Sequence, residues 1–223
     1  MGIEKPIIIG YSGSLAYYNP SAKIYRNSFI RDWFWTYNHL STDPSTRSPF
    51  FLFQAVLYLK NVYKIDGKQI QLHLWGNIDE RNKLQAKNLA ISDIVKIEGY
   101  KQKEESLAKM KSCDLLFLPL ESETKASKPL FIPGKLFEYL KMGKPVLALG
   151  GQSDCTEILK KSGLGIIFES QDTKAIADQL VSFISDKDLL DKYIPDNDYI
   201  GQYSFENITR KLAAVFNEAL NHK

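Results

Sequence analysis

The chain has 223 residues, of which 44% are hydrophobic and 25% are charged, and its formal net charge is +3. This length suits one domain with a single core, and so balanced a charge does not indicate nucleic acid or another polyanionic partner. No apolar run approaches the roughly 20 residues that span a bilayer, and the N-terminus lacks a basic-then-apolar signal pattern. The cysteines, Cys113 and Cys155, have the spacing of neither a disulfide framework nor a metal-ligand pair, so we expect a soluble, cytoplasmic protein.

Short apolar runs typical of strands that are covered on both faces recur along the chain. They occur at 6–11, 70–75, 94–98, 114–118, 145–149 and 164–168. Stretches with helical period separate or follow them, at 48–63, 79–90, 103–111, 134–142, 153–161, 172–184, 187–193 and 204–221. This alternation predicts an α/β fold, a doubly wound, Rossmann-like and mostly parallel sheet of about six strands with helices on both faces. The apolar stripe of the last helix predicts that it docks on the body of the domain.

Residues 15–48 break the alternation. This segment has no clean period and is crowded with aromatic side chains: Tyr17, Tyr18, Tyr25, Phe29, Trp33, Phe34, Trp35 and Tyr37. We interpret it as an insertion. Its aromatic residues either cap one edge of the sheet or form an interface with a missing domain.

The most informative segment is 129–149, which passes from a loop to a short helix to a buried strand. Pro133 suits a first helical position, Gly134 leaves the backbone open to approach, and Gly143 ends the helix. At 100° per residue, Leu136, Phe137 and Leu140 form the core stripe, and Glu138 lies on the side of Gly134.

A carboxylate beside the electropositive start of a helix suits a nucleoside diphosphate. The backbone around Pro133, Gly134, Lys135 and Leu136 would bind phosphate oxygens, and Glu138 would accept both ribose hydroxyls. The alternative interpretation of Glu138 is an ordinary solvated helix residue.

A second glycine-rich turn follows the first strand, where Gly13 and Ser14 could offer amides to a diphosphate. Its spacing does not match G-x-G-x-x-G, and Asp32 falls in the insertion rather than at the end of a second strand. By itself this turn is weak evidence for a phosphate site.

The order of these features resembles the C-terminal, donor-binding domain of glycosyltransferase family four, in the GT-B superfamily. The resemblance covers nearly the whole chain. It rests on the opening strand and glycine loop, the second strand ending in glycine, two central strand segments, the helix-strand motif and the closing strand: 7–15, 72–77, 95–100, 115–119, 133–149 and 163–168.

This resemblance implies roles for individual residues. Glu138 matches the second acid of the family's E-x7-E motif, which holds the ribose, whereas the first acid is replaced by Leu130. Glu121 and Glu123 are therefore candidate contacts to the transferred sugar. Main-chain groups between Ile97 and Tyr100, Gly99 included, would contact the base.

The family's basic pair, which neutralises the departing diphosphate, is harder to place because the insertion obscures the alignment. Arg81 is our preferred candidate; the alternatives are Lys23, Arg26, Arg31 and Lys83. We expect no metal cofactor, because no His, Asp and Glu cluster has ligand spacing and the resembling fold uses cations and a helix dipole instead.

The resemblance implies a retaining glycosyltransferase of polysaccharide biosynthesis. Residues 1–223 would form a single domain that binds a nucleoside-diphosphate sugar, such as that of UDP or GDP, and an N-terminal domain would bind the acceptor. We expect this half alone to be inactive, because positioning the acceptor supplies much of the rate. Peripheral membrane association through the missing half stays open. The alternatives are half of a sugar-nucleotide epimerase and a non-enzymatic protein-interaction module.

Overall fold

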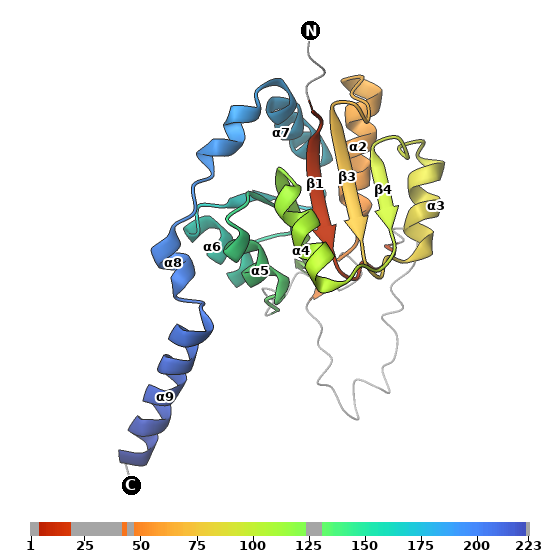
Figure 1. The fold of residues 1–223 in the computed structure, drawn as a ribbon. Coiled ribbons are helices and arrows are strands. Elements are labelled where there is room, and N and C mark those ends of the chain that lie inside the picture. Colours follow the sequence, from red (N-terminus) through yellow and green to blue (C-terminus); the bar gives the residue numbers. More distant parts are fainter. Residues whose placement is uncertain (1–4, 19–41, 44–46, 124–130, 222–223) are drawn as a thin grey trace.

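The computed structural model describes residues 5–18, 42–43, 47–123 and 131–221, and its centre is a six-stranded sheet (Figure 1). All strand pairs in this sheet are parallel. The strands are β1 (Ile7–Ser12), β3 (Ile70–Trp75), β4 (Val95–Glu98), β5 (Leu115–Pro119), β7 (Val146–Leu149) and β8 (Gly165–Phe168). Each one falls on a predicted apolar run, so the expected strands and the doubly wound parallel sheet are confirmed.

The strand order is β4-β3-β1-β5-β7-β8. The chain therefore builds outward from β1 in one direction and then returns to place β5 on the other side of β1. In open α/β sheets, a reversal of this kind leaves a crevice at the carboxyl ends of the two central strands. In this sheet those ends follow Ser12 of β1 and Pro119 of β5, and we call this edge the crevice.

Helices cover both faces of the sheet (Figure 1). The first core cluster combines α2 and α7 with one face of the strands, and the second combines α4, α5 and α6 with the other face. The bounds are α2 Phe50–Val62, α3 Glu80–Asn88, α4 Lys103–Ser112, α5 Lys135–Met142, α6 Asp154–Lys161 and α7 Thr173–Ser185. These six helices match the predicted ones.

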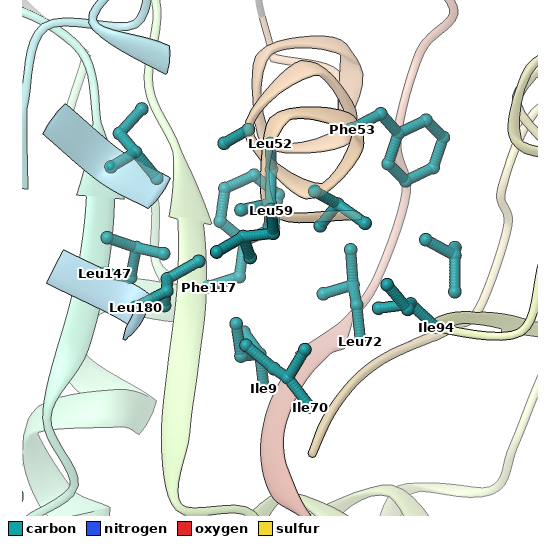
Figure 2. Packing of buried hydrophobic residues seen from close by; sticks show 14 of the residues in the cluster. Ile9, Leu52, Phe53, Leu59, Ile70, Leu72, Ile94, Phe117, Leu147 and Leu180 are labelled. Atoms are coloured by element: carbon teal, nitrogen blue, oxygen red, sulfur yellow. The ribbon is translucent and has the colours of Figure 1, made fainter. Parts of the chain in front are cut away.

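The first cluster shows why the sequence folds this way. Leu52 and Leu59, one face of α2, are fully buried, and so are Ile9 and Leu72 on the strands (Figure 2). Each fully buried aliphatic side chain contributes about 1.5–3 kcal/mol of transfer free energy. Burial on both faces explains why the strands are continuously apolar instead of alternating.

The smaller elements differ from expectation or were not foreseen. The helix expected at 187–193 is a 3₁₀-helix, η2 (Lys187–Lys192), and a short α8 (Asn197–Gly201) follows it. A second sheet pairs β2 (Thr42–Asp43) with β6 (Ser122–Glu123) in antiparallel fashion. This pairing joins the end of the 15–48 segment to the loop that follows β5.

Only the ends of the 15–48 segment lie among the described residues. Tyr18 packs against Phe50 and Phe51 at the start of α2, with ring centroids 5.2 and 5.5 Å apart. The aromatic residues from Tyr25 to Tyr37 lie outside the described residues. Whether they cap a sheet edge or meet another domain therefore stays a prediction.

The last helix, α9 (Phe205–Asn221), differs from expectation. It extends away from the body, on the side towards which the strands run (Figure 1). The large residues of its apolar stripe are exposed, to fractions of 48–91%: Phe205, Ile208, Leu212, Val215, Phe216 and Leu220. The prediction that α9 docks on the body was wrong because amphipathicity indicates a covered face but not which partner covers it. No helix in the described ranges is long and apolar enough to cross a membrane.

Replacing Leu212 and Phe216 together by glutamate is expected to leave the free energy of unfolding of this chain within about 0.5 kcal/mol, as for other exposed sites. Urea denaturation measures this change. Leu159→Ala on α6 is the matched control, because Leu159 is fully buried and its truncation should cost about 2–5 kcal/mol. A large loss in the double variant would mean that α9 packs on the body after all.

Candidate functional site

Three glycine loops are joined at the carboxyl edge of the sheet. The backbone N–H of Gly13, after β1, donates to the Trp75 carbonyl at 2.9 Å, and that of Gly76, after β3, donates to the Gly99 carbonyl at 3.2 Å. Gly76 has φ +122°, and a Cβ there would lie 2.3 Å from the Gly13 carbonyl oxygen. The loops are therefore packed backbone to backbone, which only glycine allows at position 76.

This packing corrects one sequence expectation. The Gly13 amide is already bonded to Trp75 and is not available to a phosphate in this structure. The neighbouring Ser14 is exposed, and its carbonyl accepts a 2.7 Å hydrogen bond from the Tyr11 hydroxyl. Gly13 matters instead because it has no side chain, which lets another side chain approach its backbone.

That side chain is Lys135, which approaches through its ammonium group. A Cβ on Gly13 would lie 2.3 Å from Lys135 Nζ, and Nζ is 5.2 Å from the centroid of the Tyr11 ring. Burial lowers the pKa of Lys135, the Glu138 carboxylate opposes that shift, and the Arg47 cation adds to it. Lys135 thus holds a partly desolvated positive charge over the first glycine loop.

Helix α5, which carries Lys135, starts at the same edge. Its first internal bonds run from the Leu136 amide to the Pro133 carbonyl (2.9 Å) and from the Phe137 amide to the Gly134 carbonyl (3.2 Å). Within the described parts of the chain, the amides of Gly134 and Lys135 have no intramolecular partner. A Cβ on Gly134 would meet nothing within 4 Å. The helix start is open to an anion at Gly134 and Lys135, whereas the Leu136 amide is already used.

The sequence of α5 explains its orientation. Leu136, Tyr139 and Leu140 are buried, Glu138 and Gly134 are exposed, and Gly143 ends the helix in the left-handed conformation at φ +63°. The predicted stripe was right for Leu136 and Leu140. Phe137 is only half-buried and packs on Tyr203, with ring centroids 5.3 Å apart, while Tyr139 takes the central place in the core. Glu138 lies on the open side, as predicted.

Arg47 is the functional candidate that the sequence analysis missed. Its guanidinium carbon lies 4.7 Å from the centroid of the Phe131 ring, and its Nη1 lies 3.9 Å from Glu121 Oε1. The β2–β6 pairing brings its segment to the loop after β5. The sequence did contain one indication of this position. In a parallel sheet the helix that follows β1 begins at the carboxyl edge, so a basic residue just before the 48–63 helix is expected near the crevice.

Other sequence candidates are placed less favourably or not at all. Arg81 forms a two-point contact with Asp79, Nε to Oδ1 at 2.9 Å and Nη2 to Oδ2 at 2.6 Å, and it stacks on Tyr17. Hydrogen bonds from Arg81 lower the pKa of Asp79 to about 2. Arg81 is thus engaged in the cap of α3, and its role at the diphosphate stays a prediction.

Of the remaining candidates, some lie among the described residues and others lie outside them. Gly99 and Tyr100 lie exposed after β4, and Tyr100 is 82% accessible. Glu121 lies at the crevice, because it comes two residues after Pro119, the last residue of β5. The side chain of Glu123 and the whole of Leu130 lie outside what the structure describes, as do Lys23, Arg26 and Arg31.

Histidine and cysteine do not build a metal site in the described ranges. No group of three or more His, Cys, Asp or Glu side chains there converges on a point that could hold an ion. His73 lies 3.8 Å from Glu98, and burial lowers the pKa of its imidazole. Both cysteines are free and buried. The absence of a metal requirement stays a prediction.

Together these residues define a doubly wound sheet with a charged crevice at its switch point. Two cations, Lys135 and Arg47, are flanked by two carboxylates, Glu138 and Glu121, and by the open start of α5. Cations beside free amides bind phosphate groups, and carboxylates accept hydrogen bonds from hydroxyl groups. This arrangement suits an anion that carries hydroxyl groups at its margin.

The sequence model of the family described as glycosyl transferases group 1 matches residues 51–186, which is more than half of the chain. The chain belongs to this family, so the expected membership of the GT-B superfamily is confirmed. The narrower placement in family four stays a prediction. No curated protein matches the chain in sequence.

Solved structures share the fold. HepE from Anabaena in complex with UDP is 17% identical with a TM-score of 0.56, covering 97% of this chain and 50% of that one. Sucrose-phosphate synthase from Thermosynechococcus elongatus is 15% identical with a TM-score of 0.64, covering 100% and 47%. A glycosyltransferase from Rickettsia africae is 15% identical with a TM-score of 0.60, covering 99% and 49%. The chain spans about half the length of these proteins.

Gly76→Ala is expected to destabilise the protein by about 1–3 kcal/mol, because alanine strains the backbone at this positive φ and its Cβ collides with Gly13. Urea denaturation measures the change. Gly201→Ala is the control: a Cβ there meets nothing within 4 Å, so the free energy of unfolding should hold or rise slightly. Equal stability of the two variants would contradict the packing of the glycine loops.

Proposed function

We propose that this chain is the donor-binding half of a retaining glycosyltransferase and that the crevice after β1 and β5 binds a nucleoside-diphosphate sugar. The observation that carries the proposal is the Lys135 ammonium held against Gly13 beside the open start of α5. Membership in the glycosyl transferases group 1 family supports it. Structures of the Anabaena protein with UDP and with UDP-glucose favour UDP as the nucleotide. The retaining outcome rests on the family-four resemblance.

The diphosphate would lie between the two cations. Lys135 approaches from the start of α5, and Arg47 approaches from the chain segment that precedes α2. Each cation stabilises negative charge on phosphate oxygens, and the amides of Gly134 and Lys135 complete the cradle. Because charge grows on the diphosphate as the sugar departs, the same groups would lower the barrier to bond breaking.

The nucleoside would lie between the start of α5 and the loop that follows β4. Glu138 is exposed one turn into α5 from Gly134, so its carboxylate is placed to accept both ribose hydroxyls. The loop at Gly99 and Tyr100 is exposed and joined to the glycine loops through the Gly76 amide. The Gly99 carbonyl is already used by Gly76, so the other main-chain groups of this loop and the Tyr100 ring would be available to the base.

The acceptor would be held by another half of the enzyme. The solved structures are about twice as long as this chain, and their similarity extends over nearly all of it. The exposed apolar stripe of α9 supports a partner of this kind, because it offers a ready docking face beyond the carboxyl edge of the sheet. This half alone would then bind donor without transferring sugar.

Calorimetry with UDP, GDP and ADP tests the donor site. The wild-type chain should bind one diphosphate, and Lys135→Met should weaken it about tenfold or more, because a charged hydrogen bond contributes about 1.5–3 kcal/mol. Lys141→Met is the matched control, since Lys141 is exposed on the same helix. The proposal fails if no nucleotide binds the wild type, or if the two lysine variants lose affinity equally.

Glu138→Gln is expected to weaken the bound nucleotide about tenfold through loss of a charge-assisted acceptor for the ribose. The sharper measurement uses the 2′,3′-dideoxy form of that nucleotide. This analogue should bind wild type and Glu138→Gln with the same affinity, because the hydroxyls that Glu138 accepts are gone. A persistent difference between the two proteins would place Glu138 elsewhere than at the ribose.

A further inference from the structure

Tyr11 is a buried tyrosine near the end of β1. Its side chain is only 2% exposed and belongs to the first core cluster, together with Ile7 and Ile9 of the same strand. Helix α5, in contrast, packs on the other face of the sheet. The Lys135 ammonium nevertheless lies over the Tyr11 ring, 5.2 Å from its centroid. The lysine side chain therefore crosses the carboxyl edge of the sheet, over Gly13, to reach this ring.

The contact between Lys135 and Tyr11 is an attraction between a cation and an aromatic face. An ammonium within about 6 Å of a ring centroid is attracted by the negative face of the ring, most strongly where water is excluded. Burial lowers the pKa of Lys135, and the ring face favours the charged form that burial disfavours. Within the described ranges no acceptor bonds to Lys135 Nζ. Its N–H donors are therefore left for a ligand.

The hydroxyl of Tyr11 fixes the first glycine loop. It donates to the Ser14 carbonyl at 2.7 Å and so closes a turn in which Gly13 has φ +138°. Burial raises the pKa of Tyr11, so the hydroxyl stays protonated and remains a donor at neutral pH. A Cβ on Gly13 would lie 3.4 Å from this hydroxyl oxygen. One side chain therefore holds the loop with its hydroxyl and the lysine cation with its ring.

Resting on the donor site proposed above, we infer that Tyr11 is a positioning residue that holds the Lys135 ammonium in place for the diphosphate. The ring keeps the ammonium over Gly13 before a nucleotide arrives, and the phosphate binds to the N–H donors that point away from the ring. A lysine side chain loses much rotamer freedom when it becomes ordered. Because Tyr11 orders Lys135 in the free protein, less of this cost falls on nucleotide binding. Tyr11 is buried and acts only through Lys135.

The test has to change the charge on the ring face without changing its packing. Tyr11 also packs against Phe117, with ring centroids 6.0 Å apart, so removal of the ring would disturb the core as well as the cation. Phenylalanine that carries no, one, two or three fluorine atoms, placed at position 11, avoids this. Fluorine withdraws electrons from the ring face and so weakens its attraction for a cation, while the ring keeps nearly the same size.

Calorimetry measures the affinity for UDP across this series, in the wild-type background and in Lys135→Met. Tyr11→Phe should bind UDP within about threefold of the wild type, because the ring is kept and the exposed Ser14 carbonyl can bond to water. Each added fluorine should weaken UDP further, by about three- to tenfold over the series. In Lys135→Met the same series should be flat, because no ammonium is left for the ring to attract.

Phe53 provides the matched control. It is a fully buried aromatic residue of α2 in the same core cluster (Figure 2). The same fluorinated residues at position 53 should leave the affinity for UDP unchanged. Urea denaturation checks that every variant is folded. If loss of the hydroxyl unfolds Tyr11→Phe, ring-fluorinated tyrosine at position 11 gives the same measurement, because burial keeps its hydroxyl protonated by raising the pKa of Tyr11.

The outcomes separate this inference from the proposed donor site. No UDP binding by the wild type, or binding that Lys135→Met leaves unchanged, would overturn the donor site itself. Where UDP binding depends on Lys135, the Tyr11 inference alone fails if fluorination leaves the affinity unchanged or if its effect persists in Lys135→Met. Tighter binding on fluorination would also overturn it, because the ring would then compete with phosphate for the ammonium. Equal losses at Phe53 would identify a packing effect instead.

Discussion

The reversal of strand order between β1 and β5 is the constraint on which the site depends. Chain segments leave the two strands in opposite directions, so no crossover covers their carboxyl ends. Gly13 follows β1, Glu121 follows β5, and α5, which follows them in sequence, starts beside Gly13. Residues more than 100 positions apart therefore meet at one edge of the sheet.

The charges gathered there are balanced, which lets them be partly buried without a ligand. Lys135 and Arg47 offset Glu138 and Glu121, and the aromatic rings of Tyr11 and Phe131 lie under the two cations. Among the described residues Lys135 forms no ion pair, and Arg47 lies 3.9 Å from Glu121, whereas Arg81 is fixed by Asp79 at 2.6 Å. Loose pairing suits the cations to the phosphate that we propose they bind, whereas the Arg81 pair stabilises the start of α3.

The exposed helix α9 is tied to α5 through the residues at and just before its start. Asn207 in its first turn donates to the Gly201 carbonyl at 2.7 Å, and Tyr203, just before it, packs on Phe137 of α5. Phe137 is the neighbour of Glu138. If the chain is half of an enzyme, as we propose, a partner covering the apolar stripe of α9 would act on an element that contacts α5, the proposed donor-binding helix.

The sequence by itself determined where the strands lie, that the sheet is parallel, and on which side of its helix Glu138 lies. Apolar runs and helical period suffice for this, because they depend only on local spacing. The sequence did not give the engaged amide of Gly13, the placement of Lys135 Nζ against that glycine, or the meeting of Arg47 with Glu121. Those depend on the β2–β6 pairing and on the switch point, which join distant segments. The same holds for the exposed face of α9. The amphipathic pattern shows that one face is apolar, but only the tertiary structure shows that the body does not cover it.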